Sequence, residues 1–406
     1  MKNSVLKNKN LDLLFLSAFI SAVFSESQSI ALSLYVLNKT QSVTAFSTLL
    51  AITLFSSIWL RPFTGVLADK WNRKTELIVL NFLSFLVLIV TSLFADNNLS
   101  LVVIYGLVII LNIITAFYST GSASLVRVLA GKEQLSEAYS INSFISSCQA
   151  LLSPILGALL FSSFGIITIF TVNGLSFLVA LIGILFVNIP DLRTEPAKGS
   201  FTKNFISGFS YFLHQKVIKR IAFTLMFFNF FAIPLISVGE GYVLKLTLKV
   251  SNQQFAFSQT IGVVGTLLGP VIFHLMKNKI KLEKLFFLSI LELSGLILIL
   301  GISASKVLSS NFYSYILYLA TFFVMCIVET LLNIAISTQI QSNIDLSYSG
   351  RLGGIMAIMF MGLTPFGQLL YGALFEYLPV AYPFMLTTVI YVIIALYYKR
   401  GMEESN

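Results

Sequence analysis

Long apolar runs separated by short polar connections recur along the whole 406-residue chain. About 20 apolar residues are enough to cross the hydrocarbon core of a bilayer as an α-helix. The pattern predicts twelve such helices, over residues 12–36, 43–68, 75–95, 99–121, 137–162, 166–188, 217–239, 255–276, 285–303, 312–340, 352–375 and 381–398. The sequence therefore predicts an all-α protein with twelve transmembrane helices.

The composition supports the same class of protein. Hydrophobic residues make up 57% of the chain and charged residues 11%, and the mean hydropathy is +0.89. A soluble domain carries about 25% charged residues, so this chain has too little polar surface to remain in water. Cys148 and Cys326 both fall inside predicted spans, where packing is a better explanation than a disulfide.

The basic residues predict how the chain is oriented. If both termini are cytoplasmic, the inner segments hold all 26 Lys and Arg residues except Lys39, Arg61, Lys245, Lys249 and Lys306. This asymmetry follows the positive-inside rule. The net charge of +9 then reflects insertion and contact with anionic lipid, and no basic soluble domain is present to bind nucleic acid. We expect a multi-pass protein of the cytoplasmic membrane with both termini inside.

The longest inner connection divides the chain into two halves. It begins with Pro190 and Pro196 and continues as a weakly amphipathic segment with regularly placed phenylalanines. This pattern predicts a linker followed by a helix on the inner membrane surface. The expected domains are therefore a six-helix bundle over residues 1–189, a cytoplasmic linker over 190–216 and a second six-helix bundle over 217–406.

The two halves also share proline positions. Pro62 and Pro270 each precede a basic inner turn, after the second and the eighth span. Pro154 in the fifth span corresponds in the same way to Pro365 in the eleventh. Paired interruptions at matching positions indicate a duplicated transporter with two pseudo-symmetric bundles and a binding site between them.

The segment GVLADKWNRK, from Gly65 to Lys74, carries the most specific motif. It resembles the loop signature of the major facilitator superfamily: a glycine, then an aspartate, then basic residues at fixed spacing. In that family the loop holds the cytoplasmic side closed in one conformation. The resemblance assigns this latch role to Asp69 and Arg73, within a motif that also includes Lys70. The alternative is an ordinary basic inner loop.

A second motif lies in the fifth predicted span. Antiporter branches of the family carry a glycine-rich stretch there that ends Gly-Pro-x-x-Gly-Gly. In this chain Pro154 and Gly157 match, while Ser153 and Ala158 replace two of the glycines. Small residues still allow two helices to pack closely, and the resemblance favours antiport.

Taken whole, the chain resembles the macrolide-efflux-type branch of the drug–proton antiporters. The resemblance rests on residues 126–147, on the connection FTKNFISGFSYFLHQKVIKRIAF and on residues 348–375. It implies a monomeric bacterial transporter for a small-molecule substrate, with protons as the coupling ion. Many relatives place an arginine linked to proton transfer in the fourth span, where this chain has Asn112, so any coupling must rely on other residues.

Five carboxylates fall within or beside the predicted spans. Glu26, Glu292 and Glu329 are expected at depth, whereas Glu240 and Glu376 are expected near outer ends with lesser roles. A charged side chain at the bilayer centre costs at least about 2.5–3.5 kcal/mol on insertion scales. Such a residue must face a wet cavity, pair with a cation or hold a proton, and a carboxylate in changing surroundings can exchange protons near neutral pH.

The candidate residues for proton coupling or substrate contact are therefore Glu26, Glu329, Glu292, Arg61 and Asn112. In an alternative interpretation, Glu26 or Glu329 pairs with Arg61 as a fixed structural bridge.

Missing motifs narrow the function further. The chain has no phosphate-binding loop of the G-x-x-x-x-G-K-[ST] type, and its two histidines and two cysteines form no metal or nucleophile pattern. We therefore expect no cofactor, no metal and no enzyme activity, with a membrane-embedded enzyme as a remote alternative. The sequence favours a secondary active transporter that exports amphipathic, drug-like molecules by alternating access. The main alternative is the same fold carrying a peptide, siderophore or sugar.

Overall fold

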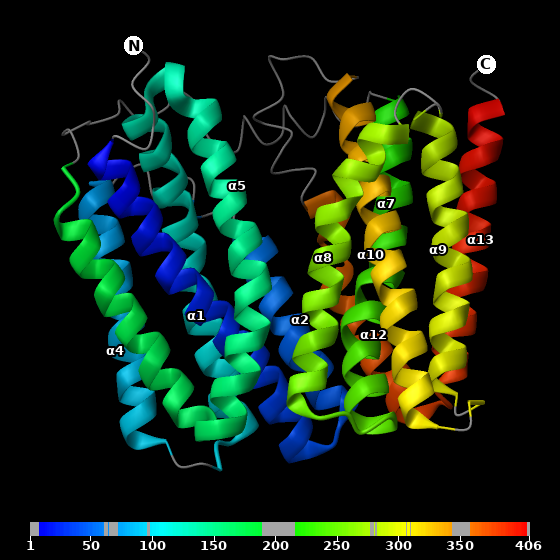
Figure 1. Cartoon of the computed structure of the whole chain (residues 1–406), viewed down its shortest axis with the longest axis horizontal. Coiled ribbons are helices and arrows are strands. Elements are labelled where there is room, and N and C mark those ends of the chain that lie inside the picture. The colour runs from blue at the N-terminus through cyan, green and yellow to red at the C-terminus, as the bar shows by residue number, and fades with distance from the viewer. Residues whose placement is uncertain are drawn as a thin grey trace. The chain divides into compact units, whose positions relative to one another are not determined.

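The computed structural model describes residues 8–60, 64, 72–95, 98–188, 216–276, 280, 282–305, 307–308, 310–342 and 358–403. Every regular element in these residues is a helix. The chain forms two compact units. The first consists of Met1–Asn38 and Trp59–Gly199, and the second of Lys39–Ile58 and Ser200–Asn406. Figure 1 shows long helices within each unit.

The first unit contains α1 (Lys9–Thr40) except its last two residues, α4 (Arg73–Phe94) and the 85-residue α5 (Leu101–Leu185). Two glycines interrupt α5, because the backbone is non-helical at Gly131 (φ 61°) and at Gly165 (φ 80°). Glycine adopts positive φ without steric cost. The two breaks divide α5 into three helical segments, and α4 packs against α5.

The second unit contains the other helices: α2 (Val43–Trp59), α7 (Lys216–Glu240), the π-helix η2 (Gly241–Thr247), α8 (Asn252–Met276), α9 (Leu282–Ala304), α10 (Asn311–Ser342), α12 (Thr364–Tyr377) and α13 (Ala381–Glu403). α10 packs against both α8 and α9, α13 packs against α9, and α12 packs against α7. Figure 1 shows these long helices side by side.

The predicted all-α membrane architecture is confirmed. Ten segments of the described chain are long and apolar enough to cross a membrane. One of them, Gln134–Leu185, has 52 residues and is broken at Gly165, so it accounts for two predicted spans. The remaining predicted span corresponds to the shorter apolar helix Val43–Trp59.

One helix groups differently from the expected division of the chain. The sequence places the second span in the N-terminal bundle, but α2 belongs to the second compact unit. Two contacts with α12 explain this. Gly372 lies so close to Ser47 that no larger residue fits. In addition, Glu376 Oε2 accepts hydrogen bonds from the backbone N–H groups of Val43 (2.8 Å) and Thr44 (3.0 Å) at the start of α2.

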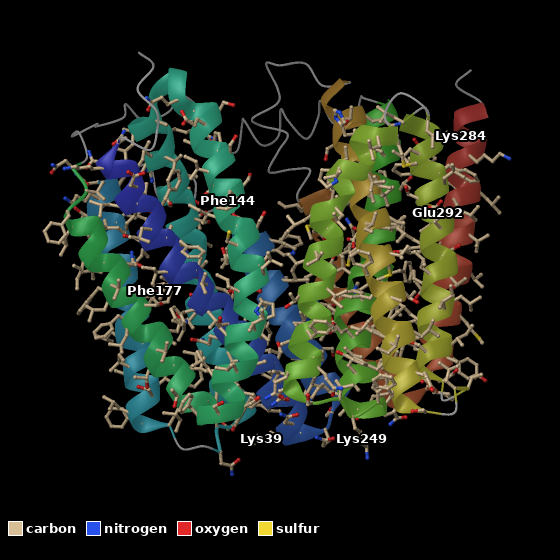
Figure 2. All side chains as sticks on the ribbon, viewed as in Figure 1. Lys39, Phe144, Phe177, Lys249, Lys284 and Glu292 are labelled. Carbon is tan, nitrogen blue, oxygen red and sulfur yellow. The ribbon has the colours of Figure 1, made fainter. Side chains whose placement is uncertain are left out.

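The ends of the second unit carry basic residues that were predicted to face opposite sides of the membrane. Figure 2 shows Lys39 and Lys249 at one end and Lys284 at the other. Lys39 and Lys249 are expected outside and Lys284 inside. Between the ends, many large apolar side chains are exposed, as a lipid-facing surface requires.

Candidate functional site

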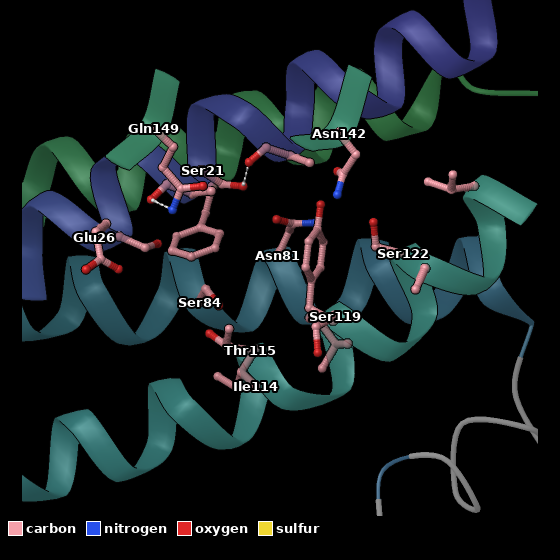
Figure 3. A pocket seen from close by; sticks show the side chains of 18 of the residues that line it. Ser21, Glu26, Asn81, Ser84, Ile114, Thr115, Ser119, Ser122, Asn142 and Gln149 are labelled. Carbon is pink, nitrogen blue, oxygen red and sulfur yellow. Dashed lines mark hydrogen bonds between the residues drawn. The ribbon is translucent and has the colours of Figure 1, made fainter. Parts of the chain in front are cut away.

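A cavity of about 370 Å³ lies inside the first unit. Its walls come from α1, α4 and all three segments of α5. Figure 3 shows Glu26 near one end of this cavity and Asn142 and Ser122 toward the other. The lining combines one carboxylate with hydroxyl, amide and apolar groups: Ala18, Ser21, Ala22, Ser25, Glu26, Leu80, Asn81, Ser84, Ile114, Thr115, Tyr118, Ser119, Ser122, Ala123, Val126, Tyr139, Asn142, Gln149 and Phe177.

A close contact between α1 and α5 fixes the position of the segment that carries Glu26. The hydroxyl of Ser27 donates to Ser153 O at 3.1 Å, and the hydroxyl of Ser153 donates to Val23 O at 3.1 Å. A Cβ atom at Gly157 would lie 2.5 Å from Ser27 O, so only glycine fits there. The motif of Pro154 and Gly157 therefore forms the surface on which α1 packs.

The polar residues around Glu26 are held by α5. Asn173 donates through Nδ2 to Gln28 Oε1 at 2.7 Å, and the hydroxyl of Ser25 donates to Asn173 Oδ1 at 3.4 Å. Glu26 itself is exposed to the cavity. No hydrogen bond or ion pair to its carboxylate occurs within the part of the chain that the structure describes. Glu26 is the one charged group among the described residues that line the cavity.

Two further polar groups face the cavity without a complete hydrogen-bond set. The hydroxyl of Tyr118 points toward Asn81 and Ser21. Neither this hydroxyl nor Asn81 Oδ1 makes a hydrogen bond of good geometry to another described residue. A buried polar atom without a partner is costly, so these atoms favour a polar ligand or water in the cavity. Elsewhere on the wall, the Tyr139 hydroxyl accepts from Arg127 Nε at 3.1 Å in an exposed hydrogen bond.

None of the other predicted coupling residues that the structure describes is among the residues that line this cavity. Asn112 belongs to α5 but does not line the cavity, and its Nδ2 is buried with no partner among the described residues. Glu329 of α10 is half-buried and Glu292 of α9 is exposed, and both belong to the second unit. Figure 2 shows Glu292 nearer the Lys284 end of that unit than the Lys249 end. Arg61 lies outside the described residues.

Only the last part of the predicted latch motif is described. Gly65, Asp69 and Lys70 lie outside the described residues. Arg73 pairs with Glu76 at 3.1 Å. Lys74 Nζ donates to the backbone carbonyls at positions 185 and 187, at 2.9 and 2.7 Å. A lysine at the carboxyl end of a helix satisfies free carbonyls and complements the helix dipole, so Lys74 has a structural role that the motif did not predict.

One carboxylate has surroundings that the sequence did not predict. Glu240, expected near an outer end with a lesser role, is only 5% exposed. Its carboxyl oxygens lie within hydrogen-bond distance of Ser258 Oγ (2.6 Å) and Gln259 Nε2 (3.0 Å). Ser258 and Gln259 interrupt an apolar run in the sequence. This interruption is the signal that could have indicated a buried polar cluster.

Comparison with known proteins settles the family. The sequence profile of the Major Facilitator Superfamily matches residues 14–368. The chain belongs to the Major Facilitator Superfamily. It is therefore a secondary transporter of a membrane, and not an enzyme. Two structural features agree with this membership. They are the long apolar helices and the cavity with polar lining groups inside the first unit.

Curated relatives are distant. The chain is 23% identical over 372 residues to the uncharacterised MFS-type transporter YkuC of Bacillus subtilis, covering 86% of this chain and 82% of that protein. It is 26% identical over 273 residues to macrolide efflux protein A of Enterococcus faecalis, covering 62% of this chain and 83% of that protein. These similar proteins are bacterial.

Solved structures show the same fold at low identity. The nucleoside transporter NupG is similar with a TM-score of 0.75 and 11% identity, over 96% of this chain and 98% of NupG. A bacterial homologue of the iron transporter ferroportin, in its inward-facing state, has a TM-score of 0.68 and 16% identity, over 98% and 99%. These matches confirm the major facilitator fold.

Proposed function

We propose that this transporter exports amphipathic, drug-like molecules of the macrolide type across the cytoplasmic membrane in exchange for protons. The observation that carries the proposal is the carboxylate of Glu26, the one charged group among the described residues that line the cavity. An exposed carboxylate in a confined apolar setting attracts a cationic group or a proton. Competition between these two for one site is the simplest basis for exchange.

The rest of the wall suits an amphipathic substrate. Leu80, Ile114, Val126 and Phe177 supply apolar surface, while serine, asparagine and glutamine side chains supply hydrogen-bond groups. Small-molecule pockets have volumes of about 300–1,000 Å³ and combine an apolar lining with a few polar groups. The cavity of about 370 Å³ is at the lower end of this range, so a large substrate would also need groups from outside the first unit.

The similarity to macrolide efflux protein A supports export as the direction and macrolide-like molecules as the substrate class. In this proposal, Glu329, Glu292, Arg61 and Asn112 remain candidates for proton coupling. Alternating access moves the two units against each other, and the Gly65–Lys74 loop closes the cytoplasmic side. The protein acts as a monomer with both termini in the cytoplasm.

Efflux of a drug panel tests the proposal directly. Cells that overproduce the transporter are loaded with a macrolide, a cationic dye and a neutral amphipathic compound, and efflux is measured with and without a protonophore. We expect faster efflux than in cells with an empty vector, and we expect the protonophore to abolish the difference. Uptake of a peptide, siderophore or sugar, with no drug efflux, would instead support the alternative transporter of an endogenous solute.

A further inference from the structure

A second carboxylate is built into the interior of the second unit. Glu240 is the last residue of α7, within the span Ile221–Thr247, and the chain continues from it directly into the π-helix η2. The residue is only 5% exposed. Its Oε1 lies 2.6 Å from Ser258 Oγ and its Oε2 lies 3.0 Å from Gln259 Nε2, both on α8. π-Helical turns are frequent at functional sites, which makes this carboxylate a candidate.

No cation compensates this carboxylate in the described part of the chain. Lys245 of η2 is close in sequence, but its ammonium group donates to Val250 O (3.0 Å) in the η2–α8 connection and to Asn252 Oδ1 (2.8 Å) at the start of α8. Glu240 forms no ion pair with any described residue. An ionised carboxylate buried without a cation is strongly disfavoured, so the site favours a neutral acid.

The other groups around Glu240 are uncharged aromatic, hydroxyl and thiol groups. On α10, Tyr315, Tyr318 and Cys326 all lie within electrostatic range of Glu240. The hydroxyl of Tyr315 is already used, because it donates to a backbone carbonyl of α8 at 2.9 Å. On α12, the ring of Phe375 lies against the backbone beside Glu240. None of these groups supplies a positive charge.

The hydrogen-bond contacts of Ser258 are compatible with a protonated Glu240. Ser258 Oγ is 2.6 Å from Glu240 Oε1 and 2.7 Å from the carbonyl oxygen of Phe255. A serine hydroxyl has one proton, so it cannot donate to both oxygens at once. A protonated Glu240 that donates to Ser258 Oγ, with Ser258 donating to Phe255 O, gives each of the two short contacts its own proton. Oε2 then remains the acceptor for Gln259.

We propose that Glu240 is a proton-binding site of the second unit, occupied by a proton in the conformation described here. When the proton is released to water, the Ser258 hydroxyl turns from Phe255 O and donates to the carboxylate. Its use in transport rests on the proton antiport proposed above. Binding of the proton itself is a property of the site and can be measured separately.

Infrared spectroscopy of the full-length protein in lipid tests the binding of the proton. The C=O stretching band of a protonated carboxyl group should be present in the wild type and should lose intensity in Glu240→Gln. Asp12→Asn, which removes an exposed carboxylate from α1, should leave the band unchanged. Ser258→Ala should move the band to higher wavenumber, because the acid loses the acceptor of its hydrogen bond. Equal band intensity in wild type and Glu240→Gln, or an unmoved band in Ser258→Ala, would overturn the proposal.

Transport in proteoliposomes then tests the role of that proton. Glu240→Gln should lose about tenfold or more of proton-driven uphill efflux, yet retain exchange of labelled for unlabelled substrate without a gradient. Unchanged uphill efflux in Glu240→Gln would remove the site from the coupling mechanism. If wild-type efflux does not depend on the proton gradient at all, the antiport proposal fails, while the infrared result still decides whether Glu240 holds a proton.

Discussion

Side chains in the run Ser25–Gln28 divide between two surfaces of α1. Ser25 and Gln28 bond to Asn173, and Ser27 bonds to α5 through Ser153, whereas Glu26 faces the cavity. A polar cluster within an apolar run could be recognised from the sequence. The sequence alone could not show which of these side chains contact α5 and which face the cavity. Asn173 is 145 positions away from Gln28, and their pairing depends on how α5 folds back.

We predict that Glu26→Gln changes substrate preference. Glutamine keeps the size and the hydrogen-bond capacity of the side chain but removes the charge. Efflux of a cationic substrate should fall about tenfold, equivalent to about 1.4 kcal/mol, while efflux of a neutral analogue should fall much less. The measurement is proton-driven efflux of both substrates from proteoliposomes at several pH values.

Asp12→Asn is the matched control for Glu26→Gln, because it removes a carboxylate from the exposed first turn of the same helix, outside the cavity. It should leave both efflux rates near those of the wild type. If Glu26→Gln moves both substrates with unchanged pH dependence, the carboxylate is a tolerated polar group, and substrate recognition must be assigned elsewhere.

Among the elements, the pairing of α1 with α5 depends on the absence of a side chain at Gly157. We predict that Gly157→Ala forces the two helices apart, because its Cβ would lie 2.5 Å from Ser27 O. Overpacking of this kind costs about 1–3 kcal/mol. Thermal unfolding in detergent should therefore occur at a lower temperature, and transport should weaken because the segment that carries Glu26 is displaced.

Gly106→Ala provides the comparison on the same element, since a Cβ there meets nothing within 4 Å. Alanine is the better helix former, so this variant should be as stable as the wild type or slightly more stable. Equal stability of Gly157→Ala and Gly106→Ala would show that the α1–α5 contact is looser than described.

The start of α2 depends on a carboxylate from another helix. Glu376 Oε2 accepts from Val43 N and Thr44 N, and also from the hydroxyls of Ser42 (3.2 Å) and Thr44 (3.4 Å). A negative charge at a helix N-terminus satisfies free N–H groups and complements the helix dipole. This pairing could not be predicted from the sequence, because it joins residues more than 330 positions apart.

We predict that Glu376→Gln loosens α2 from α12. Loss of the charged acceptor should destabilise the contact by about 1 kcal/mol. A disulfide introduced between the two helices should then form more slowly, as measured by oxidation and gel mobility. Tyr377→Phe, at the neighbouring and largely exposed position, should leave the rate unchanged. An unchanged rate in Glu376→Gln would mean that packing at Gly372 alone holds α2.

For the whole molecule, hydrophobic periodicity was sufficient to predict the fold class. Apolar runs identify membrane helices because the bilayer requires a fixed length of apolar helix. The same pattern could not predict that Gly131 and Gly165 divide α5 into three segments, nor that α2 groups with the second unit. Those features depend on backbone conformation and on contacts between distant helices.

The orientation of the whole molecule in the membrane is also a prediction. Lys39 and Lys249, which are expected outside, lie at one end of the second unit, and Lys284, which is expected inside, lies at the other (Figure 2). A test needs a cysteine-free background, obtained by replacing Cys148 and Cys326 with alanine. Cys326 is buried and Cys148 is partly buried, so the background must first be shown to transport.

In that background, single cysteines should report the side of the membrane. Cysteine at Asn97 or Ser310 should react with an impermeant thiol reagent added to intact cells, because both positions lie in predicted outer connections with few basic residues. Cysteine at Lys132 or Lys281 should react only after the membrane is made permeable. Reactivity at Lys132 and Lys281 in intact cells, with none at Asn97 and Ser310, would reverse the orientation. Protons driven inward would then meet the second unit from the Lys284 end, and export would have to be reassigned as import.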